Sequence, residues 1–123
     1  MRESVAMLAG PMTTDVPSFE LAVDADDGRV TFTPRGELDL ATAPELEDKV
    51  LFAIREGGRQ VVLDLRELSF MDSTGVRTIV SAHQAADESG CELRVVRPAR
   101  ESPVSRVIEI SGIDEALGLV DEP

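Results

Sequence analysis

The sequence is poor in the residues that build stacking platforms, disulfides and zinc sites. Its 123 residues include no Trp or Tyr, four Phe, one His and one Cys. So few aromatic rings leave no platform on which the bases of a single-stranded nucleic acid could stack. Cys91 has no partner for an internal disulfide, which favours a reducing compartment. One His and one Cys are too few for a standard structural zinc site.

Long hydrophobic runs are also missing. The apolar run near the start, Val5–Ala9, is shorter than the core of a signal peptide and far shorter than a membrane span. We therefore expect a cytoplasmic protein that makes no direct contact with a membrane. Residues 1–17 show no hydrophobic periodicity, and we expect them to be a flexible lead-in to a single domain over residues 18–123.

Positive charge is scarce relative to negative charge. The 24 acidic and 12 basic residues give a net charge of −12, and the excess is spread along the chain. Such a surface repels nucleic acid phosphates and anionic lipids, so no direct nucleic acid partner is expected. A protein with a basic patch is a better match. The apolar content of 42% indicates a folded globular domain.

Catalytic motifs are absent as well. The sequence contains no phosphate-binding loop, no dinucleotide-binding glycine pattern and no nucleophile elbow. His83 falls on or beside the apolar face of a predicted helix, where a structural role is favoured over a catalytic one. Cys91 heads a predicted strand and is expected to be semi-buried. We expect no catalytic residue, no metal and no cofactor, and hence a protein that is not an enzyme.

The apolar pattern predicts a hairpin followed by alternating helices and strands. Apolar residues alternate over Phe19–Val23 and again from Val30 to Phe32, and Asp26–Gly28 between them is typical of a turn. The segment Pro34–Gly36 is expected to break or bend the second strand. Val61–Leu65 alternates little, which indicates a central strand covered on both faces.

Helix boundaries are marked by capping residues. Thr42 and Glu45 match a capping box with Pro44 in the first turn, and Gly57–Gly58 ends that helix. A second helix follows residue 73 and stops at 89–90, and a parallel strand follows over 93–96. Ser102 caps a third helix that closes at 111–112, before a last apolar segment. The fold class is therefore α/β: a small mixed sheet, formed by an N-terminal hairpin and parallel strands, with helices packed on it.

The segment Ser69–Gly75 joins the central part of the sheet to the second helix. It places Ser73 where a strand and loop turn into a helix, beside the free N–H groups of the helix start. Asp72 and Ser73 compete for the N-cap, and plain capping is one reading of both residues. Gly75, which is unfavourable inside a helix, suggests room for the backbone of another molecule.

Two acidic residues precede the first helix. Glu37 and Asp39 are expected in a loop, either with local hydrogen bonds or as an acidic surface near Ser73. Loops that follow neighbouring parallel strands emerge on the same edge of a sheet. That arrangement would bring Asp39 and Ser73 together.

Three stretches of this sequence resemble the STAS domain family, in particular the bacterial anti-sigma factor antagonists. The segment Val62–Leu65 followed by Ser69–Gly75 is similar to the signature of the family. The family's first helix start is matched by Gly36–Asp39 together with Thr42 to Pro44. Its last helix is matched by Val107–Ile113. The resemblance covers about residues 18 to 120, and it implies a STAS-like fold.

The resemblance also implies a function. In such proteins the serine that matches Ser73 is phosphorylated by the partner, an anti-sigma factor with serine kinase activity. The unphosphorylated antagonist binds that partner and sets a sigma factor free for transcription, and a phosphatase resets the phosphoserine. The residues expected to contact the partner are Asp39, Asp72, Ser73, Thr74, Gly75 and Arg77.

The sequence departs from the family pattern at two positions. Many relatives carry a small residue where Arg77 stands, which puts in doubt which anti-sigma factor is recognised. Thr74 replaces a commoner Ser and is a second, less favoured phosphate acceptor. An alternative function is a soluble STAS-like regulatory subunit of a membrane lipid or anion transport assembly.

Overall fold

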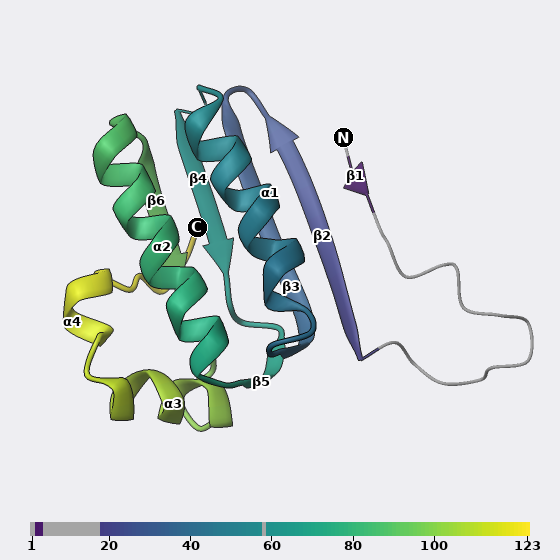
Figure 1. The fold of residues 1–123 in the computed structure, drawn as a ribbon, viewed down its shortest axis with the longest axis vertical. Helices are drawn as coiled ribbons and strands as arrows, with labels where there is room; N and C mark the ends of the chain where they lie inside the picture. Colours follow the sequence, from purple (N-terminus) through teal and green to yellow (C-terminus); the bar gives the residue numbers. More distant parts are fainter. Residues whose placement is uncertain (1, 4–17, 58) are drawn as a thin grey trace, which may run out of the picture.

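The fold begins with the expected hairpin (Figure 1). The computed structural model describes residues 2–3, 18–57 and 59–123, in which β2 (Phe19–Asp26) pairs antiparallel with β3 (Arg29–Leu38). Asp27 and Gly28 have φ values of 53° and 84°, as a tight two-residue hairpin turn requires. β1 (Arg2–Glu3) pairs with β2. Otherwise the predicted lead-in lies outside the described residues.

The described strands form one mixed sheet in the order β1-β2-β3-β4-β6, and β5 pairs with β3. β4 (Gln60–Asp64) is parallel to both of its neighbours, β3 and β6 (Glu92–Val96). β5 (Leu68–Met71) pairs in parallel with the last residues of β3. The central strand, the parallel pair and the fold class predicted from the sequence are confirmed.

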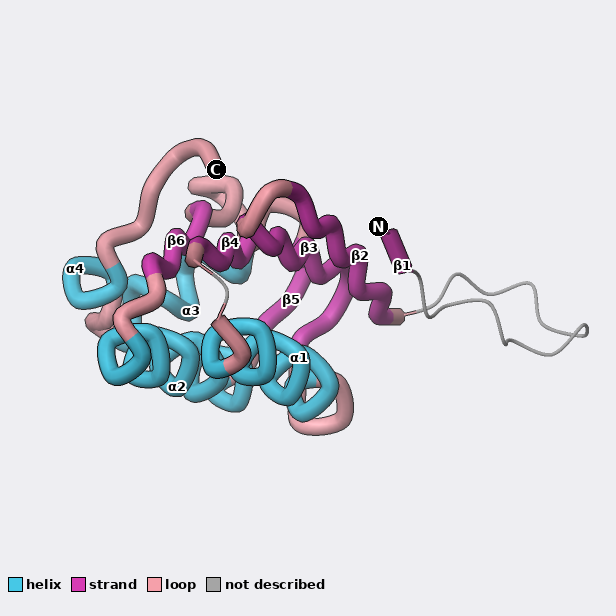
Figure 2. The backbone as a smooth tube through the Cα atoms, turned by 90° about the horizontal axis from the view of Figure 1, so that it is seen from above, coloured by secondary structure: helices cyan, strands magenta, loops and turns pink. Residues whose placement is uncertain are grey.

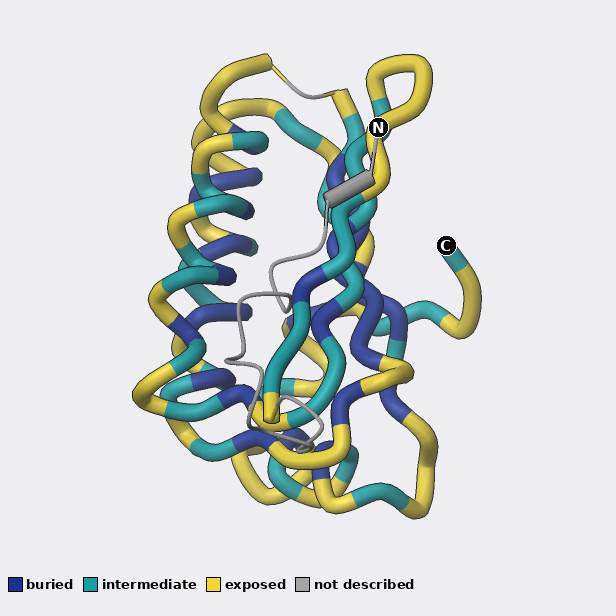
Figure 3. Tube along the Cα trace, turned by 90° about the vertical axis from the view of Figure 1, so that its right-hand side faces the viewer, coloured by how far each residue is buried: buried dark blue, intermediate teal, exposed yellow. Residues whose placement is uncertain are grey.

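The two longest helices cover one face of this sheet. α1 (Ala43–Arg55) and α2 (Ser73–Ser89) lie side by side on it (Figure 2). α3 (Pro103–Ser111) packs against β5, and α4 (Asp114–Leu117) follows it. Buried residues follow the strands and the inward sides of the helices (Figure 3). The largest buried side chains are Phe32, Leu21, Leu38, Leu46, Ile54, Leu63, Leu65 and Met71. None of the helices in the described ranges is long and apolar enough to cross a membrane.

The end of β3 corrects one prediction. Pro34–Gly36 bends the strand without breaking it, because β3 continues to Leu38 with a shift of register between Gly36 and Glu37. Gly36 has a φ of 94°, and a Cβ atom there would lie 2.1 Å from the carbonyl oxygen of Ser18. Only glycine fits this close backbone approach. Glu37, expected in a loop, therefore lies in the strand.

The predicted capping box at the start of α1 is wrong. Thr42 occupies the N-cap position, but its side chain makes no capping hydrogen bond. Its hydroxyl instead donates to the carbonyl of Glu37 at 2.8 Å and accepts from the N–H of Asp39 at 2.9 Å. Thr42 thus closes the loop between β3 and α1. Pro44 lies in the first turn of α1, as predicted.

Candidate functional site at the start of α2

The first turn of α2 shows which of the two candidate residues caps the helix. Oδ1 of Asp72 accepts a hydrogen bond from the N–H of Thr74 at 2.8 Å, so Asp72 is the N-cap. The carbonyl of Asp72 also accepts from the N–H groups of Gly75 and Val76, at 3.0 and 3.3 Å. Ser73 is therefore the first residue of the helix, and its side chain is not needed for capping.

Ser73 is exposed and unengaged. In the part of the chain that the structure describes, neither its hydroxyl nor its N–H has a hydrogen-bond partner, although the N–H groups of the next three residues are all bonded. The N-terminus of a helix carries a partial positive charge that favours an anion. The Ser73 hydroxyl is thus open to another molecule, with a free N–H donor beside it. Thr74 is half-buried and less open.

Asp39 and Asp72 lie on the same edge of the sheet, where the sequence predicted that Asp39 and Ser73 come together. Leu38 of β3 pairs with Met71 of β5, and the N–H of Asp72 donates to the carbonyl of Leu38 at 3.2 Å. Each aspartate follows one member of that pair, so both belong to the edge of the sheet from which α2 starts. The local hydrogen bonds expected of Asp39 are present, because its Oδ1 accepts from the N–H groups of Ala41 and Thr42, at 3.0 and 3.2 Å.

Leu40 is a part of this edge that the sequence did not single out. Its side chain is 76% exposed in the loop between β3 and α1, directly after Asp39. The signal was available, because an apolar residue in a tight loop before a helix start has no strand or helix face to bury it. A partner that covers this edge would remove apolar surface of Leu40 from water, which favours binding.

Gly75 requires a different explanation from the one its position in the sequence suggested. It is buried on the inner side of α2, where a Cβ atom would lie 2.4 Å from Cγ of Met71 and 3.0 Å from Cδ2 of Leu38. The interpretation that Gly75 leaves room for another molecule is wrong, since the space is filled by the core. The missing side chain lets α2 approach the ends of β3 and β5 closely, which fixes where Ser73 stands.

Arg77 follows Ser73 by one helical turn and is exposed. Residues four apart share one side of a helix, so Arg77 and Ser73 point to the same side of α2. Thr78, the next residue, points inward, and its hydroxyl donates to Oε1 of Glu47 at 3.2 Å. This contact joins α2 to α1. One side of α2 thus packs against the rest of the fold, and another side is exposed and carries Ser73 and Arg77.

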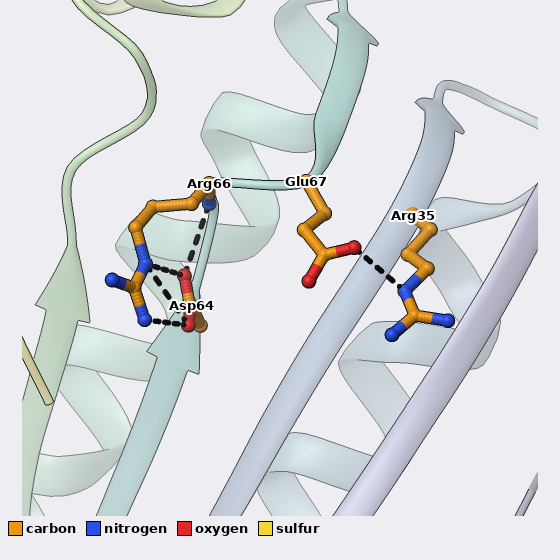
Figure 4. Close-up of polar contacts among 4 residues, drawn as sticks. All are labelled: Arg35, Asp64, Arg66 and Glu67. Carbon is orange, nitrogen blue, oxygen red and sulfur yellow. Dashed lines mark hydrogen bonds and ion pairs between the residues drawn. The ribbon is translucent and has the colours of Figure 1, made fainter.

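A charged turn leads from β4 into β5 and the site (Figure 4). Oδ1 of Asp64 accepts from the N–H and from Nε of Arg66, both at 3.0 Å, and its Oδ2 accepts from Nη2 at 2.8 Å. Oε1 of Glu67 lies 2.9 Å from Nε of Arg35 on β3 and forms an ion pair with it. Burial alone raises the pKa of the Asp64 carboxyl, but the hydrogen bonds and charge of Arg66 outweigh it and hold that pKa below its ordinary value.

The lowered pKa of Asp64 predicts a pH dependence of stability. A carboxyl whose pKa is lower in the folded than in the unfolded state adds stability that is complete above about pH 5 and is lost as the pH falls toward about pH 2. Asp64→Asn should remove this part of the pH dependence, so its unfolding curve should approach that of the wild type in acid. Urea midpoints measured from pH 7 to pH 2.5 check this.

The matched control is Asp121→Asn. Asp121 also pairs with an arginine, Arg97 at 2.8 Å, but its side chain is 75% exposed. Exposed pairs add little stability. If Asp121→Asn changes the pH profile as much as Asp64→Asn does, the buried pair at Asp64 is not its source.

His83 and Cys91 lie in the structural positions expected of them. His83 is half-buried on α2, with Nδ1 at 3.7 Å from Oδ2 of Asp87. Cys91 is half-buried before β6, and burial raises the pKa of its thiol. A thiol with a raised pKa is a poor nucleophile at neutral pH. Within residues 2–3, 18–57 and 59–123, no three potential metal ligands lie close enough together to hold an ion.

The arrangement of this sheet and its helices recurs in known proteins. The profile of the STAS domain matches residues 20–122 of this chain. The chain belongs to the STAS domain family. It is 32% identical over 82 residues to an anti-sigma-B factor antagonist of Staphylococcus aureus, and the match covers 67% of this chain and 74% of that protein.

Solved structures of STAS antagonists show the same fold. A crystal structure of an anti-sigma factor antagonist from Mycobacterium paratuberculosis has a TM-score of 0.74 and 23% identity, over 94% of this chain and 92% of that chain. Unphosphorylated SpoIIAA, an anti-sigma factor antagonist, has a TM-score of 0.65 and 23% identity, over 81% and 98%. The phosphorylated form of Bacillus SpoIIAA has a TM-score of 0.62 and 22% identity, over 77% and 86%. Antagonists of this family are regulatory proteins and not enzymes, which agrees with the sequence-based expectation.

Proposed function

We propose that this STAS protein is a phosphorylation-controlled anti-sigma factor antagonist of the bacterial cytoplasm. When Ser73 is unmodified, the protein binds an anti-sigma factor that has serine kinase activity. When Ser73 is phosphorylated, the protein releases that partner, and a phosphatase restores the unmodified form that binds. The observation that carries this proposal is the exposed Ser73 at the first position of α2, with neither its hydroxyl nor its N–H engaged.

The charges around Ser73 support a switch that acts on the partner and not on the fold. A phosphoserine carries a charge of about −1.5 to −2 at neutral pH. The helix N-terminus and the free N–H of Ser73 accommodate such a group, so the folded structure should persist. Asp72 already occupies the N–H of Thr74, so the added charge stands beside an existing carboxylate. A partner that tolerates two carboxylates there must then face a third, larger anion.

Two kinds of likeness support the proposal. The relative of 32% identity is an anti-sigma-B factor antagonist, and SpoIIAA has the same fold and exists in an unphosphorylated and a phosphorylated form. In this chain Ser73 stands at the turn with the Asp-Ser-Thr-Gly signature. Thr74 is the second acceptor, and its half-buried side chain makes it the weaker one.

The test is a comparison of the proteins retained by the wild type and by Ser73→Glu from a lysate of the source cell. The proposal requires an anti-sigma factor with a kinase-like ATP-binding domain that only the wild type retains. Recovery of a transport ATPase in its place would favour a regulatory subunit of a transport assembly. Equal recovery of the anti-sigma factor by both proteins would contradict the proposed switch.

Arg77 is proposed to set which anti-sigma factor is bound. Its exposed guanidinium stands one turn after Ser73, so a partner that covers Ser73 meets a positive charge there. Arg77→Gly should change the relative affinities for several anti-sigma factors by about three- to tenfold, measured by competition. Arg77→Ala is the matched control, because it removes the charge without the cost of a glycine inside a helix. An unchanged ranking with both variants would contradict this role.

A further inference from the structure

A second candidate surface lies at the other end of the sheet from Ser73. A groove with a volume of about 630 Å³ runs between α1 and the β2–β3 hairpin. Its floor is formed by Val23, Val30 and Phe32 of the hairpin, and its wall by Phe52 and Ala53 of α1. The volume falls in the range of functional binding sites. Most of the residues that line the groove are apolar, although the protein surface as a whole is strongly charged.

Phe52 is the residue that marks this groove as unpartnered. Its ring is 67% exposed on α1, while Val23 and Val30 beside it pack only partly against the core. A single exposed apolar residue is ordinary, but here the exposed ring continues into an apolar floor. In an interface, a large aromatic side chain next to a groove is the usual anchor.

The charges at the rim identify the kind of occupant. Asp48 and Glu56 are both exposed and lie one turn before and one turn after Phe52 on the same side of α1. Lys49, which also lines the groove, is half-buried and adds one positive charge, so the charged lining has a net charge of −1 and both of its exposed members are acidic. A second copy of this chain, also with a charge of −12, would bring like charges together. A partner with positive charges on both sides of an apolar stripe complements the rim.

We propose that this groove, lined by Val23, Val30, Phe32, Phe52 and Ala53, is a second docking surface that takes a basic amphipathic helix from another protein. A helix presents apolar residues along one stripe at three- and four-residue spacing, which suits an open groove that runs beside α1. Its lysines or arginines would meet Asp48 and Glu56, and its apolar side chains would cover Phe52.

The groove and Ser73 are separate in the fold. Val23 and Val30 belong to the hairpin end of the sheet, Phe52 belongs to the last turn of α1, and Glu56 is the C-cap of that helix. Ser73 follows Asp72, whose N–H bonds to Leu38 at the opposite end of β3. In Figure 1 the start of α2 lies at the end of the sheet away from the β2–β3 turn. Docking at the groove is therefore independent of the phosphorylation state of Ser73. One molecule could stay attached to a second protein while its anti-sigma factor exchanges.

The test uses the full chain and a model peptide of about 18 residues, long enough for five helical turns. One peptide has a leucine stripe flanked by lysines, and its control has the same composition in scrambled order. Methyl and aromatic NMR signals are followed during titration. The shifts should be confined to Val23, Val30 and Phe52 and their neighbours, and the scrambled peptide should bind at least about tenfold more weakly.

Two variants of exposed apolar residues make a matched pair. Phe52→Ser should weaken binding of the leucine–lysine peptide by about tenfold or more, whereas Ile110→Ser, at an 80% exposed position on α3, should change it less than about twofold. The double change Asp48→Asn and Glu56→Gln should weaken binding and flatten its salt dependence. Ser73→Glu should leave peptide binding unchanged, so failure here is distinct from failure of the switch at Ser73.

Several results would overturn the proposal. Shifts spread over the acidic surface, or equal effects of Phe52→Ser and Ile110→Ser, would show that the peptide binds by charge alone. Self-association that disappears in Phe52→Ser would make a second copy the occupant. Displacement of the peptide by oleate, together with oleate binding at lower concentration, would make an acyl chain the occupant.

Discussion

Ser73→Glu is expected to weaken binding to the anti-sigma factor by about a hundredfold or more, while Ser73→Ala binds as the wild type does and accepts no phosphate at that position. A loss of this size corresponds to about 2.7 kcal/mol. Placing like charges against each other in an interface costs several kcal/mol, so one added carboxylate is sufficient. Isothermal titration calorimetry with the purified partner measures both variants directly.

The position of Ser73 explains why the effect should be so large. Its side chain is exposed at the edge of the sheet that also carries Asp39, Asp72 and the exposed Leu40. A glutamate there adds a third charge in the middle of this edge, where a bound partner excludes water and screening is weak. The fold should be unaffected, because an acidic side chain is favourable in the first turn of a helix.

Ser89→Glu is the matched control for the charge itself. Ser89 is exposed and is the last residue of the same helix, so the variant has the same net charge as Ser73→Glu at the opposite end of α2. It should bind the partner within about twofold of the wild type. A similar loss of affinity in both variants would mean that overall charge, and not the place of Ser73, controls binding.

Gly75→Ala is the second change with a large expected effect. The added Cβ would lie 2.4 Å from Cγ and 2.9 Å from Sδ of Met71, and 3.0 Å from Cδ2 of Leu38. Both neighbours are fully buried, so they have no free space into which to move. Overpacking of this kind costs about 1–3 kcal/mol. Alanine gains up to about 1 kcal/mol in helix propensity, so we expect a net loss of about 1–2 kcal/mol.

A double-mutant cycle separates packing from other causes. Met71→Ala removes the atoms that the new Cβ would strike, so Gly75→Ala should cost less in that background than in the wild type. Urea unfolding of the four proteins gives the coupling. An equal cost in both backgrounds would show that contact with Met71 is not what excludes a side chain at residue 75. Because Leu38 and Met71 precede Asp39 and Asp72, Gly75→Ala should also weaken partner binding.

Much of the fold could be predicted because local patterns and tertiary packing agree. The alternation in β2 predicts a half-buried strand, the Asp-Asp-Gly sequence a hairpin turn, and the continuous apolar run of β4 a central strand. The structure contains all three. Ser102 caps α3 as predicted, with Oγ accepting from the N–H of Ser105 at 3.2 Å. At the turn and the cap the side chain interacts with its own segment, and in the two strands the apolar pattern matches the residues that the core buries, so sequence spacing is sufficient.

Predictions failed where a side chain or a space is used by a distant segment. Thr42 fits a capping box in sequence, but its hydroxyl donates a hydrogen bond to the carbonyl of Glu37, because β3 continues to Leu38. The space at Gly75 appeared to face outward because spacing along one helix does not show which strands pack beneath it. The groove beside Phe52 could not be predicted, because it exists only once α1 lies against the hairpin.

The role of Ser73 could be predicted in part from the sequence, and in part it required the structure. The sequence placed it at a helix start, and the resemblance to STAS antagonists named it as a phosphate acceptor. That Asp72 caps the helix and leaves Ser73 with a free hydroxyl and N–H required the structure. Strand order alone predicted that Asp39 and Ser73 lie on one edge, since parallel neighbours end together.

The most direct test of the central claim is the mapping of phosphate after the purified chain is incubated with its anti-sigma factor and ATP. Mass spectrometry of proteolytic fragments should find one phosphate, on Ser73, and none on the Ser73→Ala protein. The purified phosphoprotein should no longer bind the anti-sigma factor in calorimetry. Phosphate on Thr74 alone, or a phosphorylated protein that binds as tightly as the unmodified one, would contradict the account.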